Sequence, residues 1–407
     1  MDNGSQQTQT EWLGALTGEQ ATAAELFGRP DAEQQRLGYF HTLREICQQP
    51  WTWLQTCERI LRQRQLLEKE LRGIRSLVLT GSGSSEYAAD CVRFLLQNEL
   101  AINTQSISGG DLLMYGTKTL PPGRPGLLVS LARSGDSPES SGVVELLLDT
   151  EPEFRHIVIT CNEQGTLARK WRSHERVQIV TLPVETNDKS LVMTSSFTNL
   201  LLAARFLGML TRPAQYQNLC TALGNMTRQL IGTKMDVLAK IAESGFHRAV
   251  FLGSGSRFAA AREASLKMLE LTAGRVTTMC ETFLGFRHGP MSYVHNGTLI
   301  VCQLSCDPNL RAYELDLLRE LDRKKLGLLK LIIGENIPRA VIRDGDEVIE
   351  CRGFSAIGDE DSSTVYVVVA QLLSFFRSLE EGLMPDSPSE AGIINRVVEK
   401  FPLHAPL

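Results

Sequence analysis

Two carboxylates and an amine recur at helical spacing in the second half of the chain. Glu263, Lys267 and Glu270 are separated by four and then three residues. If this segment is a helix, the spacing places all three side chains on one face. A carboxylate beside an amine can take up and release protons, although the same pattern on a solvated helix is an ordinary ion-pair stripe. The segment is therefore a candidate for proton-transfer chemistry.

A histidine follows this segment in a short glycine and proline loop. His288 lies between Arg287 and Gly289, eighteen residues after Glu270. An imidazole there can donate a proton to one oxygen of a ligand and accept a proton from another, which is the exchange that general acid-base catalysis needs. A histidine beside Gly-Pro is more often structural, but its closeness in sequence to Glu270 favours a catalytic role. Neither His288 nor His295 has partners at metal-ligand spacing, so we predict no metal.

A turn rich in glycine and serine occurs twice, each time after an apolar run. Residues 76–80 lead into the turn 81–85, and residues 248–252 lead into the turn 253–256, 172 residues later when Gly81 is matched to Gly253. Such turns expose backbone amides at the start of a helix, where an anion can bind. A repeat of this length indicates duplicated domains rather than a solenoid.

The two turns lack the features of nucleotide-binding loops. A dinucleotide fingerprint would need a glycine where Glu86 and Phe258 stand, and no Gly-Lys-Ser/Thr follows either turn. We therefore predict no nicotinamide and no other cofactor. The hydroxyls of Ser82, Ser84 and Ser85 remain as candidate anion ligands.

A second hydroxyl-rich loop follows the apolar run 126–131. Ser134 and Ser137 flank Gly135 there, just after Arg133. Serine hydroxyls can donate to phosphate oxygens, and a helix that begins near Ser137 adds its positive end. Alone, these serines are more simply helix caps, but together with the first turn they predict a site for a small monophosphate. The segment around Ser195 opens another helix and is a weaker candidate.

The spacing of apolar runs predicts the fold. Further runs lie at 156–160, 298–304 and 329–333, with helix-compatible stretches between them. Strands that are apolar throughout and alternate with helices are typical of parallel sheets covered on both faces. We predict an α/β protein with two tandem doubly wound domains, at 51–215 and 216–380, preceded by a helical arm (1–50) and followed by an extended tail (381–407).

The composition excludes several classes of protein. Of the 407 residues, 43% are hydrophobic and 22% are charged, as in soluble globular proteins, and the net charge of -5 offers no basic face for nucleic acid. No stretch approaches about 18 uninterrupted apolar residues, and the first residues lack a signal-peptide pattern, so we expect no membrane association. The nine scattered cysteines predict a reduced, cytoplasmic protein, in which Cys302 and Cys306 serve packing.

The chain resembles the sugar isomerase (SIS) superfamily, in which tandem flavodoxin-like domains bind phosphosugars. The similarity is to the group of tagatose-6-phosphate ketose/aldose isomerases and galactosamine-6-phosphate deaminases, and it extends from about residue 40 to the C-terminus. It is carried by residues 132–140, 159–163, 261–274, 285–290 and 395–398. The resemblance implies a proton-transfer base at Glu270 and a phosphate cradle at Ser84, Ser85, Ser134 and Ser137.

The chain is also similar to the isomerase half of glucosamine-6-phosphate synthase. In that relative the histidine of a His-Gly-Pro loop assists ring opening in the neighbouring subunit, which implies that His288 completes a shared site in a homodimer or higher homo-oligomer. The synthase has a tail lysine near its substrate, whereas this chain has Asn395 and Arg396. Imine formation through a tail amine is therefore not assumed, and Asn395, Arg396 and Arg133 are kept as candidate substrate-binding residues.

The leading hypothesis is a deaminating isomerase that converts galactosamine 6-phosphate to tagatose 6-phosphate and ammonia. Three alternatives stay open. The substrate could be the epimer glucosamine 6-phosphate, the protein could be a plain isomerase of sugar phosphates without an amine, or it could be a phosphosugar-binding regulator. A glutamine-dependent synthase is disfavoured, because its glutaminase would need a cysteine at position 2, where Asp2 stands. A regulator would not need the charged segment and His288 together, which favours an enzyme.

Overall fold

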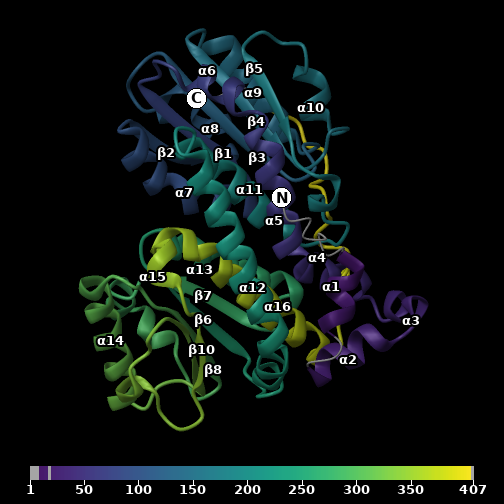
Figure 1. Cartoon of the computed structure of the whole chain (residues 1–407), viewed down its shortest axis with the longest axis vertical. Helices are drawn as coiled ribbons and strands as arrows, with labels where there is room; N and C mark the ends of the chain where they lie inside the picture. Colours follow the sequence, from purple (N-terminus) through teal and green to yellow (C-terminus); the bar gives the residue numbers. More distant parts are fainter. Residues whose placement is uncertain (1–8, 17–19, 405–407) are drawn as a thin grey trace, which may run out of the picture.

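The computed structural model describes residues 9–16 and 20–404, which form two lobes, each built on a five-stranded sheet (Figure 1). The first sheet has the order β2-β1-β3-β4-β5 and the second β10-β9-β8-β6-β7. Neighbouring strands are parallel in both sheets. Counted within its own lobe, each sheet has the flavodoxin-like order 2-1-3-4-5. The prediction of two tandem parallel α/β units is confirmed.

All six strands expected from the apolar runs are present, because the strands inside each sheet are covered on both faces. Strands β1, β3 and β8 are buried along their whole length. The first sheet consists of β1 (Ser76–Gly81), β2 (Asn103–Ser108), β3 (Gly126–Ala132), β4 (Phe154–Thr160) and β5 (Val177–Thr181). The second consists of β6 (Arg248–Leu252), β7 (Thr277–Glu281), β8 (Thr298–Gln303), β9 (Leu329–Gly334) and β10 (Glu347–Glu350).

The four strands that have no apolar run are the edge strands β2, β5, β7 and β10. Each is partly exposed and carries polar residues, so its pattern is interrupted. Cys280 and Glu281, for example, end the edge strand β7. Cys302, in contrast, lies buried in β8 as expected.

Helices alternate with the strands in both lobes. The first lobe contains α7 (Ser84–Leu100), α8 (Gly109–Tyr115), α9 (Pro138–Thr150), α10 (Thr166–Trp171) and α11 (Ser195–Arg205). The second half contains α12 (Pro213–Ala242), α13 (Ser256–Leu271), α14 (Pro308–Arg323), α15 (Phe354–Ile357) and α16 (Asp359–Glu380). Short 3-10 helices occupy several connections: η1 (Gly116–Thr119), η2 (Val184–Thr186), η3 (Phe206–Gly208), η4 (Gly285–Arg287), η5 (Pro290–Tyr293) and η6 (Arg339–Val341).

A layer of helices joins the two lobes (Figure 1). Helix α13 packs against α7 of the first lobe and against α16, which in turn packs against α12. One hydrophobic cluster passes through this layer, from Leu77 and Val129 of the first sheet to Phe251 and Val301 of the second. Because the two sheets share this core, the domain limits given above stay predictions.

Helix α16 is the one helix in the described residues that is long and apolar enough to cross a membrane. Within the protein, 94% of its most apolar window is buried. A core helix that lies between two sheets has the same composition as a membrane span, so the pattern is explained by packing.

The arm and the tail meet beside the helical layer. The arm contains α1 (Gln9–Leu16), α2 (Ala21–Gly28), α3 (Asp31–Arg36) and α4 (Phe40–Cys47), and α5 (Gln49–Leu61) and α6 (Arg64–Leu71) lead into the first sheet. Residues 381–404 form turns without helix or strand. Asp386 of this tail accepts from the backbone nitrogens of His41 and Thr42, at 3.0 and 2.7 Å, and so holds the tail to the start of α4.

Candidate active site

The candidate site lies where the strand order of the first sheet reverses, at β1. Strand β1 pairs with β2 on one side and with β3 on the other, so the chain leaves β1 and β3 toward opposite edges of the sheet. Sheets of this type bind ligands in the crevice outside the carboxyl ends of such strands. The turn 81–85 follows β1 and the loop 133–137 follows β3, which places both hydroxyl-rich segments at this crevice.

The turn after β1 depends on its glycines. A Cβ added to Gly81 would lie 2.6 Å from the backbone carbon of Ser85, and Gly83 has a φ of +56°. Glycine alone lacks the Cβ that would clash at position 81, and glycine adopts the positive φ of position 83 without strain. The turn is therefore tight enough for α7 to begin directly at Ser84.

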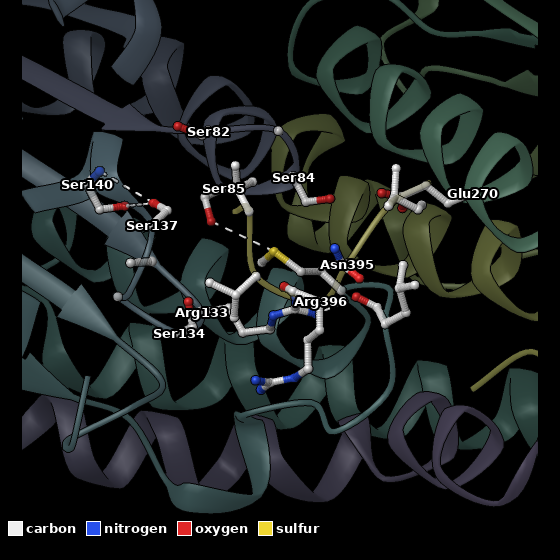
Figure 2. A pocket seen from close by; sticks show the side chains of 18 of the residues that line it. Ser82, Ser84, Ser85, Arg133, Ser134, Ser137, Ser140, Glu270, Asn395 and Arg396 are labelled. Carbon is white, nitrogen blue, oxygen red and sulfur yellow. Dashed lines mark hydrogen bonds between the residues drawn. The ribbon is translucent and has the colours of Figure 1, made fainter. Parts of the chain in front are cut away.

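A cavity of about 580 Å³ opens at the crevice, a size suited to a small ligand. Figure 2 shows its serines on one side and Glu270 on the other, with Asn395 between them. The structure thus brings the two ends of the predicted site to one cavity. The predicted residues that line it are Ser82, Ser84, Ser85, Arg133, Ser134, Ser137, Glu270, Asn395 and Arg396.

The serines of the cavity act partly as caps, as their sequence positions indicated. The Oγ atom of Ser137 caps α9 by accepting from the backbone nitrogen of Ser140 and lies 2.7 Å from the Ser140 Oγ. Ser134 Oγ accepts from the backbone nitrogen of Asp136 at 3.2 Å. A hydroxyl that accepts can still donate. The N-termini of α7 and α9 add their positive ends at the same place, so the serine side suits an anion.

Glu263, Lys267 and Glu270 lie on one face of α13, as their spacing predicted. The Nζ atom of Lys267 donates to Glu270 Oε2 at 2.5 Å and lies 3.4 Å from Glu263 Oε1. It also donates to Ser84 Oγ at 3.1 Å, which connects the charged helix to the first serine turn. Of the three charged residues, only Glu270 lines the cavity.

Burial controls the ionisation of this group. Burial raises the pKa of Glu263 to about 7, and the Lys267 ammonium opposes this rise. Burial alone would lower the pKa of Lys267, but the Glu263 and Glu270 carboxylates outweigh it and raise that pKa above its ordinary value. Lys267 therefore stays protonated. The Glu270 side chain, 23% exposed, is the carboxylate with access to a ligand, whereas those of Glu263 and Lys267 are fully buried.

The two arginines of the cavity bind the protein rather than the open space. Arg133 donates to the carbonyl oxygens of Leu191, at 2.9 Å, and Arg396. Arg396 donates to the carbonyl oxygen of Asp188 and to Asn187 Oδ1, both at 2.7 Å. These guanidinium groups hold the tail over the cavity. The part of Arg133 and Arg396 in substrate binding stays a prediction.

The structure does not bring Ser195 to the cavity. Its side chain is fully buried, and Ser195 Oγ lies 3.4 Å from Thr52 Oγ1 and 3.3 Å from Asn199 Nδ2. The start of α11 is already occupied by Asp188, which accepts from the backbone nitrogens of Ser195 and Ser196. The prediction of Ser195 as a substrate ligand is therefore corrected: a carboxylate from the same chain fills the anion position.

His288 is exposed and lies between η4 and η5 of the second lobe. It is absent from the residues that line the cavity. Its expected contribution from a neighbouring subunit stays a prediction.

The second Gly/Ser turn leads into α13 and does not line the cavity described above. Arg257, one residue into α13, is 1% exposed and pairs with Glu314 at 3.0 Å and Asp359 at 3.4 Å. It also donates to the carbonyl oxygen of Gln303 at the end of β8. The residue after the second turn is therefore part of a buried ion-pair group, and residues 253–257 do not line the cavity at the first turn.

Several cavity residues gave no signal in the sequence. Leu191, Met193 and Leu266 line the cavity, and so do apolar tail residues that flank the predicted Asn395 and Arg396, namely Ile393, Ile394, Val397 and Val398. Apolar residues of this kind carry no chemical signature, and the tail is distant in sequence. Within the described part of the chain, no three His, Cys, Asp or Glu side chains are placed to hold a metal ion.

Comparison with other proteins gives a consistent family. No protein-family model matches the chain. It is 34% identical over 373 residues to the D-galactosamine-6-phosphate deaminase AgaS of Shewanella sp. (strain ANA-3), covering 89% of this chain and 91% of that protein.

Two solved structures are similar over most of their length. The tagatose-6-phosphate ketose/aldose isomerase of Escherichia coli has a TM-score of 0.78 and 31% identity, covering 85% of this chain and 95% of that chain. A Clostridium novyi NT protein, provisionally assigned to the same activity, has a TM-score of 0.87 and 33% identity, covering 93% of this chain and 98% of that chain. The chain belongs to the AgaS-like galactosamine-6-phosphate deaminase and tagatose-6-phosphate isomerase group of SIS-domain proteins.

Proposed function

We propose that the protein is a deaminating phosphosugar isomerase, which converts galactosamine 6-phosphate and water to tagatose 6-phosphate and ammonia. The observation that carries this proposal is that Glu270 faces the same cavity as the serines after β1 and β3. The relatives are named for the same two activities, deamination and ketose/aldose isomerisation.

The phosphate would bind at the serine side of the cavity. Ser84, Ser85, Ser134 and Ser137 offer hydroxyl donors, and α7 and α9 direct their positive ends there. Binding the phosphate at one end of an extended sugar directs its other end, C1 and C2, toward Glu270. Fixing the substrate at a distance from the reacting atoms is how binding energy is used for orientation.

Glu270 would then move a proton between C2 and C1. In the open-chain sugar, its carboxylate takes the C2 proton, the electrons of the C–H bond form a C1–C2 double bond, and the aldehyde oxygen takes up a proton. Return of a proton to C1 leaves an imine at C2. Water adds to this imine and ammonia leaves, which gives the ketose phosphate. General acid-base catalysis by one carboxylate contributes about 10²- to 10⁴-fold.

Lys267 and Glu263 support this carboxylate. Lys267 holds Glu270 through the 2.5 Å contact, and the fully buried Glu263 lies 3.4 Å from the same ammonium group. Because Glu263 does not line the cavity, it acts as a positioning residue rather than as the base.

Two alternative functions remain open. A plain isomerase would use the same proton transfer on a sugar with a C2 hydroxyl and would release no ammonia. A phosphosugar-binding regulator would need only the serine side of the cavity. It would not need a carboxylate such as Glu270 at the other side.

Replacing Glu270 by Gln tests the proposal. The wild type is expected to release ammonia from galactosamine 6-phosphate, and Glu270→Gln to lose at least about 100-fold in kcat while it still binds the substrate. The matched control is Glu58→Gln on α5, an exposed carboxylate paired only with Arg62, which should retain full activity. Binding without turnover by the wild type would indicate the regulator, and ketose formation without ammonia the plain isomerase. Glucosamine 6-phosphate, assayed in parallel, reports the preferred epimer.

We also propose the assembly and the compartment. His288 would assist ring opening in the cavity of a second copy, so that the enzyme works as a homo-oligomer. All nine cysteines are free, in keeping with a reduced, cytoplasmic location.

A further inference from the structure

A buried carboxylate of the N-terminal arm is bonded to a loop of the first lobe. Glu45, on α4, is 7% exposed. Its Oε1 atom accepts from the backbone nitrogen of Lys189 at 2.5 Å, and its Oε2 atom accepts from the Ser190 hydroxyl. The backbone nitrogen of Ser190 lies 3.3 and 3.4 Å from the two oxygens. One side chain thus holds two successive amides and a hydroxyl of a segment 144 residues away.

The same loop connects the cavity wall to the tail. The carbonyl oxygens of Ser190 and Leu191 accept from Arg133 at 3.5 and 2.9 Å, and that of Asp188 accepts from Arg396 at 2.7 Å. Arg133 also donates to the carbonyl oxygen of Arg396. The loop 188–191 is therefore the base on which two arginines hold tail residues 393–399 over the cavity.

Two buried acidic side chains fix this loop, one from the arm and one from the loop itself. Asp188 is 1% exposed and bonds the start of α11, while Glu45 bonds Lys189 and Ser190 from the arm. Because a peptide bond is planar, the Lys189 amide that Glu45 accepts from shares its plane with the Asp188 carbonyl, which accepts from Arg396. The contacts of Glu45 with Lys189 and Ser190 therefore fix this carbonyl and the part of the loop that leads to the Ser190 and Leu191 carbonyls.

We propose that Glu45 is a positioning residue for the active site: it holds the loop 188–191 so that Arg133 and Arg396 keep the tail closed over the substrate. Glu45 does not line the cavity, and it acts through the backbone carbonyls that the arginines contact. The kinetic part of the test rests on the proposed function, whereas the exchange part does not.

A Glu45→Gln substitution removes hydrogen bonds that Glu45 accepts while it keeps the volume of the side chain. The amide keeps one acceptor oxygen, but its NH₂ group cannot accept from the Ser190 hydroxyl or nitrogen. A buried donor that faces another donor loses its partner. The loop should therefore shift while the volume of the side chain stays the same.

The kinetic expectation is a rise in KM with little change in kcat. For Glu45→Gln we expect a KM for galactosamine 6-phosphate about tenfold above wild type and a kcat within about twofold, because Glu270 and Lys267 on α13 are untouched. Glu25→Gln is the matched control, since Glu25 also lies in the arm and pairs with Arg29 at 2.6 Å on the surface. A fall in kcat at unchanged KM, or behaviour equal to that of Glu25→Gln, would overturn the proposal.

Hydrogen exchange of the tail gives a readout that needs no substrate. In ligand-free protein, the hydrogen-bonded tail amides of Gly392 and Ile394 should exchange about tenfold faster in Glu45→Gln than in wild type, whereas Glu25→Gln should match wild type. An unchanged tail in Glu45→Gln contradicts the proposal even if the enzyme proves to have another substrate. A wild type that releases no ammonia, in contrast, contradicts only the proposed function.

Ser190→Ala keeps the test decisive if Glu45→Gln does not fold. It removes the hydroxyl that Glu45 accepts and should raise both KM and tail exchange in the same direction. The double variant Glu45→Gln/Ser190→Ala should show less than the sum of the two single effects, since the residues act through one contact. Unchanged KM and unchanged tail exchange in Ser190→Ala would overturn the proposal, as would additive effects in the double variant.

Discussion

At the scale of single residues, the site depends on how one ammonium group is shared. Lys267 lies between a fully buried carboxylate and one that faces the cavity, and it also reaches the serine turn. A charge removed from water is tolerated only when its partners satisfy it. The same contact that stabilises Lys267 also sets Glu270 in place at the cavity wall.

Loss of one member of the buried pair should cost more than loss of both. Lys267→Met leaves Glu263 buried without its ammonium and should lower the free energy of unfolding by about 3–5 kcal/mol. Lys267→Met/Glu263→Leu, which removes both charges, should recover much of that loss. Urea denaturation of the two variants and wild type measures this, and a double variant no more stable than Lys267→Met would contradict the pairing.

The pH dependence of stability should contain a contribution from Glu263. Burial raises its pKa from 4.5 to about 7 in the folded protein, so between these values the folded state holds a proton that the unfolded chain has released. The free energy of unfolding should then fall as the pH rises from about 4.5 to about 7. Glu263→Gln should reduce this slope in denaturation curves recorded across the window. An unchanged slope would mean that Glu263 is ionised throughout.

At the scale of elements, the turn from β1 into α7 positions the serine side. The parallel sheet brings the ends of β1 and β3 together, and the tight turn starts α7 at Ser84, within reach of Lys267. The geometry of the site therefore rests on a close approach between Gly81 and Ser85 that no side chain permits.

A methyl group at Gly81 should disrupt this approach. Gly81→Ala would place a Cβ 2.6 Å from a backbone carbon and 2.8 Å from a backbone nitrogen, so the start of α7 must move. We expect a loss of about 2 kcal/mol or more in unfolding free energy and a strong loss of substrate binding. Gly28→Ala, at the end of α2 where nothing lies within 4 Å, is the control and should be neutral or stabilising. Thermal unfolding and ligand titration of both variants distinguish these outcomes.

At the scale of the whole molecule, the site is assembled from parts far apart in the chain. The first sheet supplies the serines, α13 of the second half supplies Glu270, and the tail returns across the cavity. The helical layer that joins the sheets holds α13 against α7, so the two lobes act as one unit. His288 lies on the outside of this unit, which is consistent with a role in a second copy.

A mixture of two inactive variants tests that role. Glu270→Gln and His288→Asn should each lose activity, but each supplies what the other lacks if the site is shared between subunits. When equal amounts are unfolded together and refolded, half of the dimers should be mixed, and each mixed dimer should have one intact site of its two. The mixture should then regain about a quarter of the wild-type sites. Recovery of no activity, with mixed dimers shown to form, would place His288 and Glu270 in the same subunit or remove His288 from the reaction.

Local patterns in the sequence determined the central strands, the common face of Glu263, Lys267 and Glu270, and the hydroxyl-rich turns. These features follow from burial on both faces of a sheet, from helical periodicity and from the conformational freedom of glycine, all of which act over a few residues.

Only the tertiary structure decided which polar groups find partners inside the protein. Ser195 lies buried away from the cavity, because Asp188 accepts from the start of α11. Arg257, after the second turn, is buried in ion pairs with Glu314 and Asp359. The edge strands and the link from Glu45 to the tail were likewise outside the reach of sequence patterns. Each depends on contacts between segments distant in the chain, and a buried polar group must be satisfied by whichever partner the fold brings to it.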